Sequence, residues 1–143
     1  MDLSNLDVKA GSNLGSTLHL LHPVDDTPLM TTPPKKSEKS KPITITVLGT
    51  DSDSYRDLLK ARARKRLAAQ KGNNQNKPVD LDETERRGIE LLASCTIGWE
   101  NIMEKGLLVP FSKSNVIQIY TRYPWIKEQV DVYMADRSNF LGG

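Results

Sequence analysis

The stretch that decides the fold runs from Trp99 to Leu141: WENIMEKGLLVPFSKSNVIQIYTRYPWIKEQVDVYMADRSNFL. It contains both tryptophans, both phenylalanines and three of the four tyrosines of the chain. Large aromatic side chains anchor protein cores and interfaces. We therefore predict that the last third of the chain forms a helical module that packs a core or docks on a partner.

Local signals predict two helices in this stretch. Ser112 is a strong N-cap residue for a helix over about 112–122, because its hydroxyl can accept a hydrogen bond from a first-turn amide. Pro124 ends that helix, since proline disfavours helical geometry in the residue before it, and it suits the first turn of a second helix over about 124–139. The connection before Ser112 holds an apolar cluster that we expect to pack on the helices: Ile102, Met103, Leu107, Leu108 and Val109.

Two further helices are predicted upstream of this stretch. Capping residues at 50–54 precede a helix over about 53–70, and acidic residues open another over about 82–97. The segment between them, 71–80, is rich in asparagine and contains glycine and proline, so we expect a flexible linker there. The first of these helices carries a basic patch: Arg56, Lys60, Arg62, Arg64, Lys65 and Arg66.

The N-terminal part of the chain gives the strand signals. Residues 43–48 alternate between β-branched apolar residues and threonine, which is the strongest strand pattern in the chain. We expect this strand to pair with 16–22 as an antiparallel β-hairpin, with 31–42 as a mobile, proline- and lysine-rich loop. The exposed edge of this hairpin could accept a strand from a partner. Residues 1–13 show no periodicity and are expected to be a loose terminus.

These signals together predict a mainly α fold of the α+β class. An N-terminal arm and a small antiparallel hairpin would occupy 1–50, and an irregular four-helix domain would occupy 51–143. The 143 residues are enough for one core with an irregular arm, although the apolar content of 37% is too low for all of the chain to be packed.

Composition narrows the class of protein. The net charge of +2 gives no global case for nucleic acid, so any such case depends on the local basic patch. The single Cys95 excludes an internal disulfide and a multi-cysteine zinc site, and it fits a reducing cytoplasm. No basic region followed by an apolar run begins the chain, and no apolar stretch is long enough to span a bilayer. We therefore expect no signal peptide and no membrane partner.

The sequence contains no recognisable catalytic pattern. His19 and His22 would face opposite sides of a strand, which is a poor arrangement for holding one metal ion. Phosphate-binding, zinc-protease and serine-hydrolase motifs are missing. Cys95 lies on a predicted apolar helix face, as a buried side chain would. We expect a protein that is not an enzyme and that uses neither a metal nor another cofactor.

The basic and aromatic residues leave alternatives open. The basic run from 56 to 71 can be an ordinary solvated helix face, a phosphate-binding surface, or a docking site for an acidic protein. Aromatic residues do not alternate with its basic residues, which argues against nucleic acid. The aromatic residues of the last third can fill the core or bind a partner. The candidates for partner binding are Trp99, Phe111, Trp125, Tyr133 and Phe140.

Several short motifs resemble a known family, over roughly residues 18–141. They are Gly98-Trp99-Glu100-Asn101-Ile102, Val109-Pro110-Phe111-Ser112 with Asn115, then Tyr120, Pro124-Trp125-Ile126 with Gln129-Val130, and Asp136-Arg137-Ser138-Asn139-Phe140-Leu141. Leu48-Gly49-Thr50-Asp51-Ser52 followed by Tyr55-Arg56, and His22-Pro23 followed by Pro28-Leu29, extend the similarity upstream. This set of motifs resembles the tail assembly chaperones of long-tailed bacteriophages.

The resemblance implies a small, mostly helical protein of the infected host's cytoplasm. Such a chaperone binds the tape-measure protein, keeps it soluble and helps tail-tube protein subunits polymerise around it, and it is missing from the finished virion. The family offers no catalytic residues to transfer. Self-association is left open. The alternatives are a structural neck or tail-completion component of the virion and a nucleic-acid-binding accessory protein that uses the basic helix.

Overall fold

Helices dominate a mixed α+β structure. The computed structural model describes residues 2–33, 35, 37–70 and 80–141. Within these ranges there are five α-helices, so the four expected from the sequence were too few. The helices are α1 (Val8–Leu14), α2 (Asp53–Gln70), α3 (Leu81–Ser94), α4 (Lys113–Arg122) and α5 (Pro124–Ala135), with 3₁₀ turns at Leu3–Leu6 and Arg137–Phe140.

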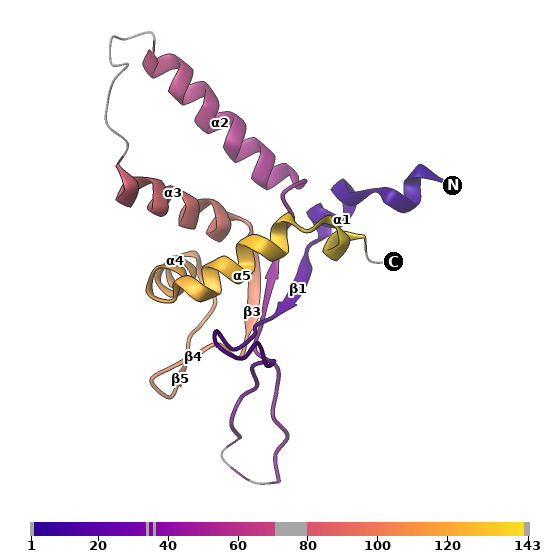
Figure 1. Cartoon of the computed structure of the whole chain (residues 1–143), viewed down its shortest axis with the longest axis vertical. Coiled ribbons are helices and arrows are strands. Elements are labelled where there is room, and N and C mark those ends of the chain that lie inside the picture. The colour runs from indigo at the N-terminus through magenta and orange to yellow at the C-terminus, as the bar shows by residue number, and fades with distance from the viewer. Residues whose placement is uncertain (1, 34, 36, 71–79, 142–143) are drawn as a thin grey trace.

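A three-stranded antiparallel sheet lies at the centre of the molecule (Figure 1). Its strands are β1 (Ser16–His19), β2 (Thr44–Val47) and β3 (Thr96–Glu100), in the order β1-β2-β3. The expected pairing of 16–22 with 43–48 is confirmed, with Leu18 opposite Ile45. The third strand was not expected. This strand lies in the range that the sequence assigned to the helical domain, and it pairs with the hairpin. The sheet therefore contains residues from both sides of the expected domain boundary between residues 50 and 51.

The end of α3 explains the missed strand. The sequence predicted a helix to about 97, but α3 ends at Ser94 and Thr96 begins β3. The Thr96 hydroxyl donates to the carbonyl of Leu92 at 2.8 Å and also meets the hydroxyl of Tyr120 at 2.7 Å. Thr96 therefore satisfies a carbonyl of the last helical turn while its backbone starts the ladder with β2, and β-branched residues favour that extended geometry.

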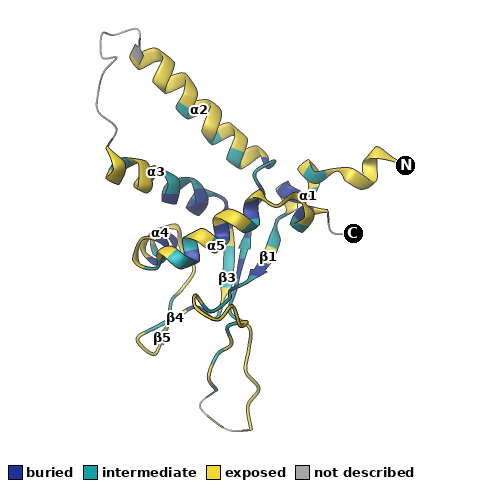
Figure 2. Ribbon diagram, in the orientation of Figure 1, coloured by how far each residue is buried: buried dark blue, intermediate teal, exposed yellow. Residues whose placement is uncertain are grey.

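The helices bury one face of the sheet. Ile45 and Val47 on β2 are fully buried, as the alternation of 43–48 predicted, and α5 packs on β2. Figure 2 shows the buried positions gathered where α3 and α5 meet the sheet. The helical part of this core consists of Ile89, Leu92, Ala93, Val116, Ile119, Tyr120, Ile126, Val130, Met134 and Phe140.

The N-terminal segment is ordered, which corrects the expected loose terminus. Asp7 caps α1 by accepting from the amide of Ala10 at 2.9 Å. The helix packs against the 3₁₀ turn Arg137–Phe140, so the first and last elements meet (Figure 1). Gly49, just after β2, donates its amide to the carbonyl of Ser12 at 3.1 Å. Tertiary contacts of this kind stabilise a short helix that lacks a sequence period of its own.

The remaining helix limits are close to those predicted. Asp80 caps α3 by accepting from the amides of Asp82 and Glu83. The last helix ends at Ala135 rather than near 139, because Asp136 caps a separate 3₁₀ turn by accepting from Ser138. The linker predicted at 71–80 lies outside the described residues, apart from Asp80.

The base of the 31–42 loop is fixed by hydrogen bonds. The Thr31 amide donates to the Lys41 carbonyl at 2.8 Å, and the Lys41 amide donates to the Thr31 hydroxyl at 2.9 Å. The mobility expected for this loop stays a prediction. Across the described ranges, no helix combines the length and the apolar character needed to cross a membrane.

Candidate functional site

A second β-hairpin, made of two short strands, connects β3 to α4 in the sequence. Its strands are β4 (Met103–Glu104) and β5 (Leu107–Leu108), with Met103 opposite Leu108. Lys105 and Gly106 form the turn, at φ angles of 54° and 80°. Two successive residues with positive φ are typical of a two-residue turn whose twist matches that of the strands.

An ion pair fastens the hairpin to α4. One guanidinium nitrogen of Arg122 donates to both carboxylate oxygens of Glu104, at 2.7 and 2.8 Å, and the Tyr123 hydroxyl donates to the same carboxylate at 2.8 Å. The hydrogen bond from Arg122, with that from Tyr123, holds the pKa of Glu104 below its ordinary value. The carboxylate therefore stays charged, and the hairpin stays fastened, at neutral pH.

The base of the hairpin is held at a second place. The Trp99 indole donates to the carbonyl of Val109 at 3.0 Å, and the Asn115 side-chain amide donates to the carbonyl of Pro110 at 2.8 Å. Trp99 also meets Phe111 edge to face, with ring centroids 5.6 Å apart. These contacts join the sheet, the hairpin and α4, so the base of the hairpin is fixed in position.

The apolar side chains of this hairpin face solvent. Leu107 is 72% exposed and Leu108 is 65% exposed. We call the exposed apolar residues of this segment the hairpin patch: Met103, Leu107, Leu108 and Phe111. Met103 and Leu108 pair across the hairpin and share one face, whereas Leu107, paired with Glu104, lies on the other face. Exposed apolar patches are typical of binding sites.

The hairpin patch corrects the expected packing of the 102–109 cluster. Of that cluster only Ile102 is buried, with Val109 half-buried at the base. The tight turn directs the two intervening strands away from the core, so Leu107 and Leu108 cannot reach the helices. The signal in the sequence was Glu104-Lys105-Gly106, which stands between the apolar pairs Ile102-Met103 and Leu107-Leu108.

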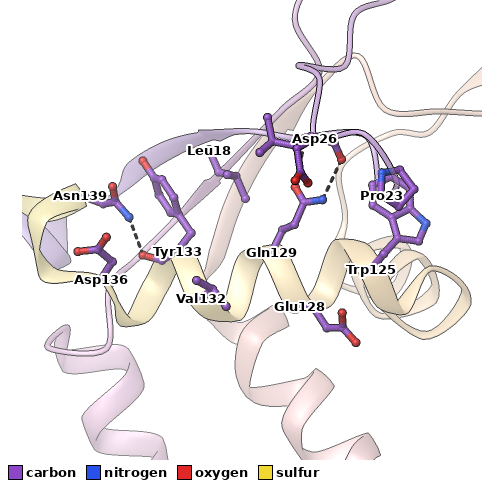
Figure 3. A pocket seen from close by; sticks show the side chains of 11 residues that line it. Leu18, Pro23, Asp26, Trp125, Glu128, Gln129, Val132, Tyr133, Asp136 and Asn139 are labelled. Carbon is purple, nitrogen blue, oxygen red and sulfur yellow. Dashed lines mark hydrogen bonds between the residues drawn. The ribbon is translucent and has the colours of Figure 1, made fainter.

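A groove of about 560 Å³ runs along the outer side of α5 (Figure 3). Trp125 and Pro23 lie at one end, and Asp136 and Asn139 lie at the other. We call it the α5 groove. Its lining is Leu18, Leu21, Pro23, Asp26, Trp125, Glu128, Gln129, Val132, Tyr133, Asp136 and Asn139.

Side chains of α5 cover the outer edge of β1 within this groove. The Gln129 amide accepts from the backbone N–H of Leu21 at 2.9 Å and donates to the Leu21 carbonyl at 2.8 Å, as an adjacent strand would. The Tyr133 hydroxyl donates to the carbonyl of Thr17 at 3.0 Å. These contacts involve Thr17 on β1 and Leu21 just after β1, so side chains of α5 meet part of the edge at which strand addition was considered. Strand addition stays a prediction.

The five aromatic candidates fall into three places. Trp99 and Phe111 support the hairpin patch, whereas Trp125 and Tyr133 line the α5 groove. Phe140 is only 4% exposed and packs edge to face on Tyr133, at 6.0 Å between ring centroids. Phe140 therefore belongs to the core and not to a partner surface, because the 3₁₀ turn after α5 directs it inward.

The basic patch of α2 is divided between paired and exposed residues. Arg62 donates to the carbonyl of Arg87 on α3 at 3.1 Å and lies 3.9 Å from the Glu90 carboxylate. Arg56 meets Asp51, at the start of the helix, at 3.3 Å. The other basic side chains, Lys60, Arg64, Lys65 and Arg66, are exposed, and Figure 2 shows exposed positions along most of the helix.

The remaining candidates for chemistry have structural roles. Burial raises the pKa of the Cys95 thiol to about 11, so the thiol is protonated and unreactive at neutral pH. The His19 ring meets the Leu29 carbonyl at 2.7 Å, and His22 accepts from the amide of Val24 at 3.1 Å. In the part of the chain that the structure describes, no group of three or more His, Cys, Asp or Glu side chains is placed to hold a metal ion.

Comparison of the chain with protein-family models, with curated proteins and with solved structures gives no match. The function is therefore argued from the residues and surfaces of this chain.

Proposed function

We propose that this chain is a phage tail assembly chaperone, a non-enzymatic protein of the host cytoplasm that binds the tape-measure protein and promotes polymerisation of the tail-tube protein. The sequence motifs that resemble this family support the proposal. The structural observation that carries it is the hairpin patch, an exposed apolar surface on a fixed base. A protein that must hold an apolar client in solution needs such a surface.

The energetics favour binding through the hairpin patch. Burying an exposed leucine side chain stabilises a complex by up to about 1.5–3 kcal/mol. Leu107 and Leu108 both project into solvent. The Arg122–Glu104 pair already orders the hairpin, so a partner does not have to order it on binding, and less of the contact free energy is lost to conformational entropy.

The kind of client that would bind follows from the apolar character of the hairpin patch. A long helical protein that is not yet assembled exposes a repeating apolar stripe along each helix. The hairpin patch is small, so one contact would be weak compared with a standard stable interface of about 1,600 Å². Many such contacts along one client would keep it soluble, and tail-tube subunits could displace them one at a time.

Co-expression with the tape-measure protein of the same phage tests the proposal. We expect the wild-type chain to raise the soluble fraction of the client and to co-purify with it. The double variant Leu107→Ser/Leu108→Ser should lose both effects while keeping its thermal midpoint. The matched control Leu14→Ser/Val24→Ser changes two apolar residues that are even more exposed but lie elsewhere. Equal co-purification of both variants, or none with the wild type, would contradict the proposal.

Mass spectrometry of purified particles separates a chaperone from a virion component. A neck or tail-completion protein would be found in the finished particle at a fixed stoichiometry. A chaperone would be found in infected cells but not in particles.

The exposed basic side chains of α2 favour one further candidate, binding to nucleic acid. Lys60, Arg64, Lys65 and Arg66 could contact phosphates, and such binding weakens steeply as salt increases. The described part of α2 beyond Tyr55 carries no aromatic side chain for stacking on bases. A filter-binding assay at low and moderate salt decides this, because no retention at either salt concentration would exclude it.

A further inference from the structure

Helix α2 carries an apolar stripe that no other described element covers. Leu59, Ala63 and Leu67 recur at every fourth residue and are all exposed, with Leu67 at 61%. The adjacent side of the helix faces α3 through Leu58 and Arg62. Helical spacing puts Lys60 and Arg64 on one side of the stripe and Arg66 on the other. From Leu58 to Gln70 the sequence has no acidic residue.

The α5 groove has the complementary character. Its lining contains the apolar residues Val132, Trp125 and Leu21 and three acidic residues, but no lysine or arginine. The acidic residues are Asp26, Glu128 and Asp136. A hydrogen bond from the Ser138 hydroxyl lowers the pKa of Asp136, which is therefore charged at neutral pH.

The two surfaces also match in length. The stripe covers nine residues from Leu59 to Leu67, and the acidic side of the groove covers nine residues from Glu128 to Asp136, which directly follows α5. At 1.5 Å per residue each is about 12 Å long. A helix lying along α5 could thus place its apolar stripe over Val132 and its basic side chains beside the acidic rim.

We propose that the chain associates with a second copy of itself head to tail, with the α2 stripe of one copy seated in the α5 groove of the next. The helix cannot reach the groove of its own chain, since Arg62 holds it on α3 and it extends away from α5 (Figure 1). Each copy keeps one stripe and one groove free, so the contact is heterologous and builds rings or open arrays.

The contact has predictable strength. A helix of about 12 Å buries far less area than a standard interface, so association is weak and depends on protein concentration. Charges at its exposed rim are screened by salt, with a Debye length of about 8 Å at physiological ionic strength. Association should therefore decrease as salt is raised. The hairpin patch takes no part in this contact, so client binding and self-association can fail independently.

Charge reversal and sedimentation velocity test the proposal. At low salt the wild-type chain should form species larger than a monomer as its concentration rises, and these should dissociate in high salt. The helix variant Lys60→Glu/Arg64→Glu/Arg66→Glu and the groove variant Asp26→Lys/Glu128→Lys should each stay monomeric. Lys is tolerated at position 26, where φ is 59°, because Lys105 itself adopts a φ of 54°.

Mixing the two variants is the decisive step. The reversed helix complements the reversed groove, and the unreversed helix of the groove variant still fits the unreversed groove of the helix variant, so an equimolar mixture should associate again. The control Lys39→Glu/Lys41→Glu/Lys105→Glu makes the same change in net charge as the helix variant, at positions elsewhere, and should associate as the wild type does. Either of two results would overturn the proposal: a wild type that stays monomeric at low salt, or a mixture that does not associate. It would also be overturned if the basic helix bound an acidic peptide or a DNA oligonucleotide while the chain stayed monomeric.

Discussion

Arg122 on α4 and Glu104 on the β4–β5 hairpin form one compact ion pair, in which a single guanidinium nitrogen donates to both carboxylate oxygens at 2.7 and 2.8 Å. This pair joins the core to the only segment in the described ranges where two adjacent leucines are exposed. It joins the hairpin that carries these exposed leucines to the C-terminal end of α4. The orientation of the proposed client site thus depends on it.

Replacing Glu104 should loosen the hairpin without unfolding the domain. In Glu104→Gln the amide cannot carry the charge that Arg122 neutralises, so we expect faster amide hydrogen exchange in residues 103–109. The conservative variant Arg122→Lys keeps the positive charge and should show a smaller increase. Unchanged exchange in Glu104→Gln would show that the ion pair does not hold the hairpin.

The same ion pair predicts a pH dependence. The folded-state pKa of Glu104 is lowered, so the unfolded chain binds the proton more readily than the folded one. The stabilisation is present above the unfolded pKa of about 4.3 and is lost as pH falls through the lower folded value. Thermal melts of the wild type and Glu104→Gln should therefore begin to converge as pH falls below the unfolded value of about 4.3. A difference that persists at lower pH would contradict this.

Docking of the N-terminal helix is tested by a pair of glycine variants. A methyl group at Gly11 would collide with the backbone carbonyl of Phe140, so Gly11→Ala should destabilise the protein by about 1–3 kcal/mol. At Gly98 a methyl group meets no atom within 4 Å, so Gly98→Ala should change stability by no more than about 0.5 kcal/mol. Denaturant unfolding measures both. Equal effects would mean that α1 does not pack on the C-terminal turn.

The hydrogen bond of the buried Tyr120 hydroxyl can be tested by mutation. It meets the Thr96 hydroxyl at 2.7 Å, so Tyr120→Phe should lower the free energy of unfolding by about 0.5–1.5 kcal/mol. Burial raises the pKa of Tyr120, so this phenol should ionise only when the protein unfolds. Stability should therefore decline as pH rises beyond the unfolded value of about 10. Ultraviolet titration of the wild type against Tyr120→Phe checks this, and a normal titration of this group in the folded protein would contradict the burial.

The burial of the Cys95 thiol can be tested by its chemical reactivity. Burial raises its pKa to about 11, and the side chain is fully buried. Iodoacetamide at neutral pH should modify Cys95 only at the rate of unfolding, so modification should accelerate in denaturant. Rapid modification in native buffer would show that the thiol is accessible.

Local signals predicted much of the helical structure. Ser112 accepts from the amide of Asn115 at 3.1 Å, and Pro124 begins α5, because caps and proline act within one turn of the chain. The pairing of β1 with β2 followed from the alternation of 43–48. Caps, proline and strand alternation depend on neighbours in sequence, which is why these features could be predicted from it.

The missed features depend on contacts between distant residues. Thr96 looked like part of a helix face, yet the ladder to β2 draws it into a strand. Gly11 gave no signal, because its partner Phe140 lies at the other end of the chain. Burial of Phe140 and exposure of Leu107 both depend on how short turns direct side chains in space. The sequence thus indicated the aromatic residues of the site but not which of them would stay at the surface.

Hydrogen–deuterium exchange on the complex of this chain with a soluble fragment of the tape-measure protein tests the central claim most directly. If the hairpin patch binds the client, amides of residues 103–111 should gain protection on adding the fragment, and the Leu107→Ser/Leu108→Ser variant should show no such gain. Binding without protection in this segment would place the client elsewhere. No binding by the wild type would contradict the chaperone account.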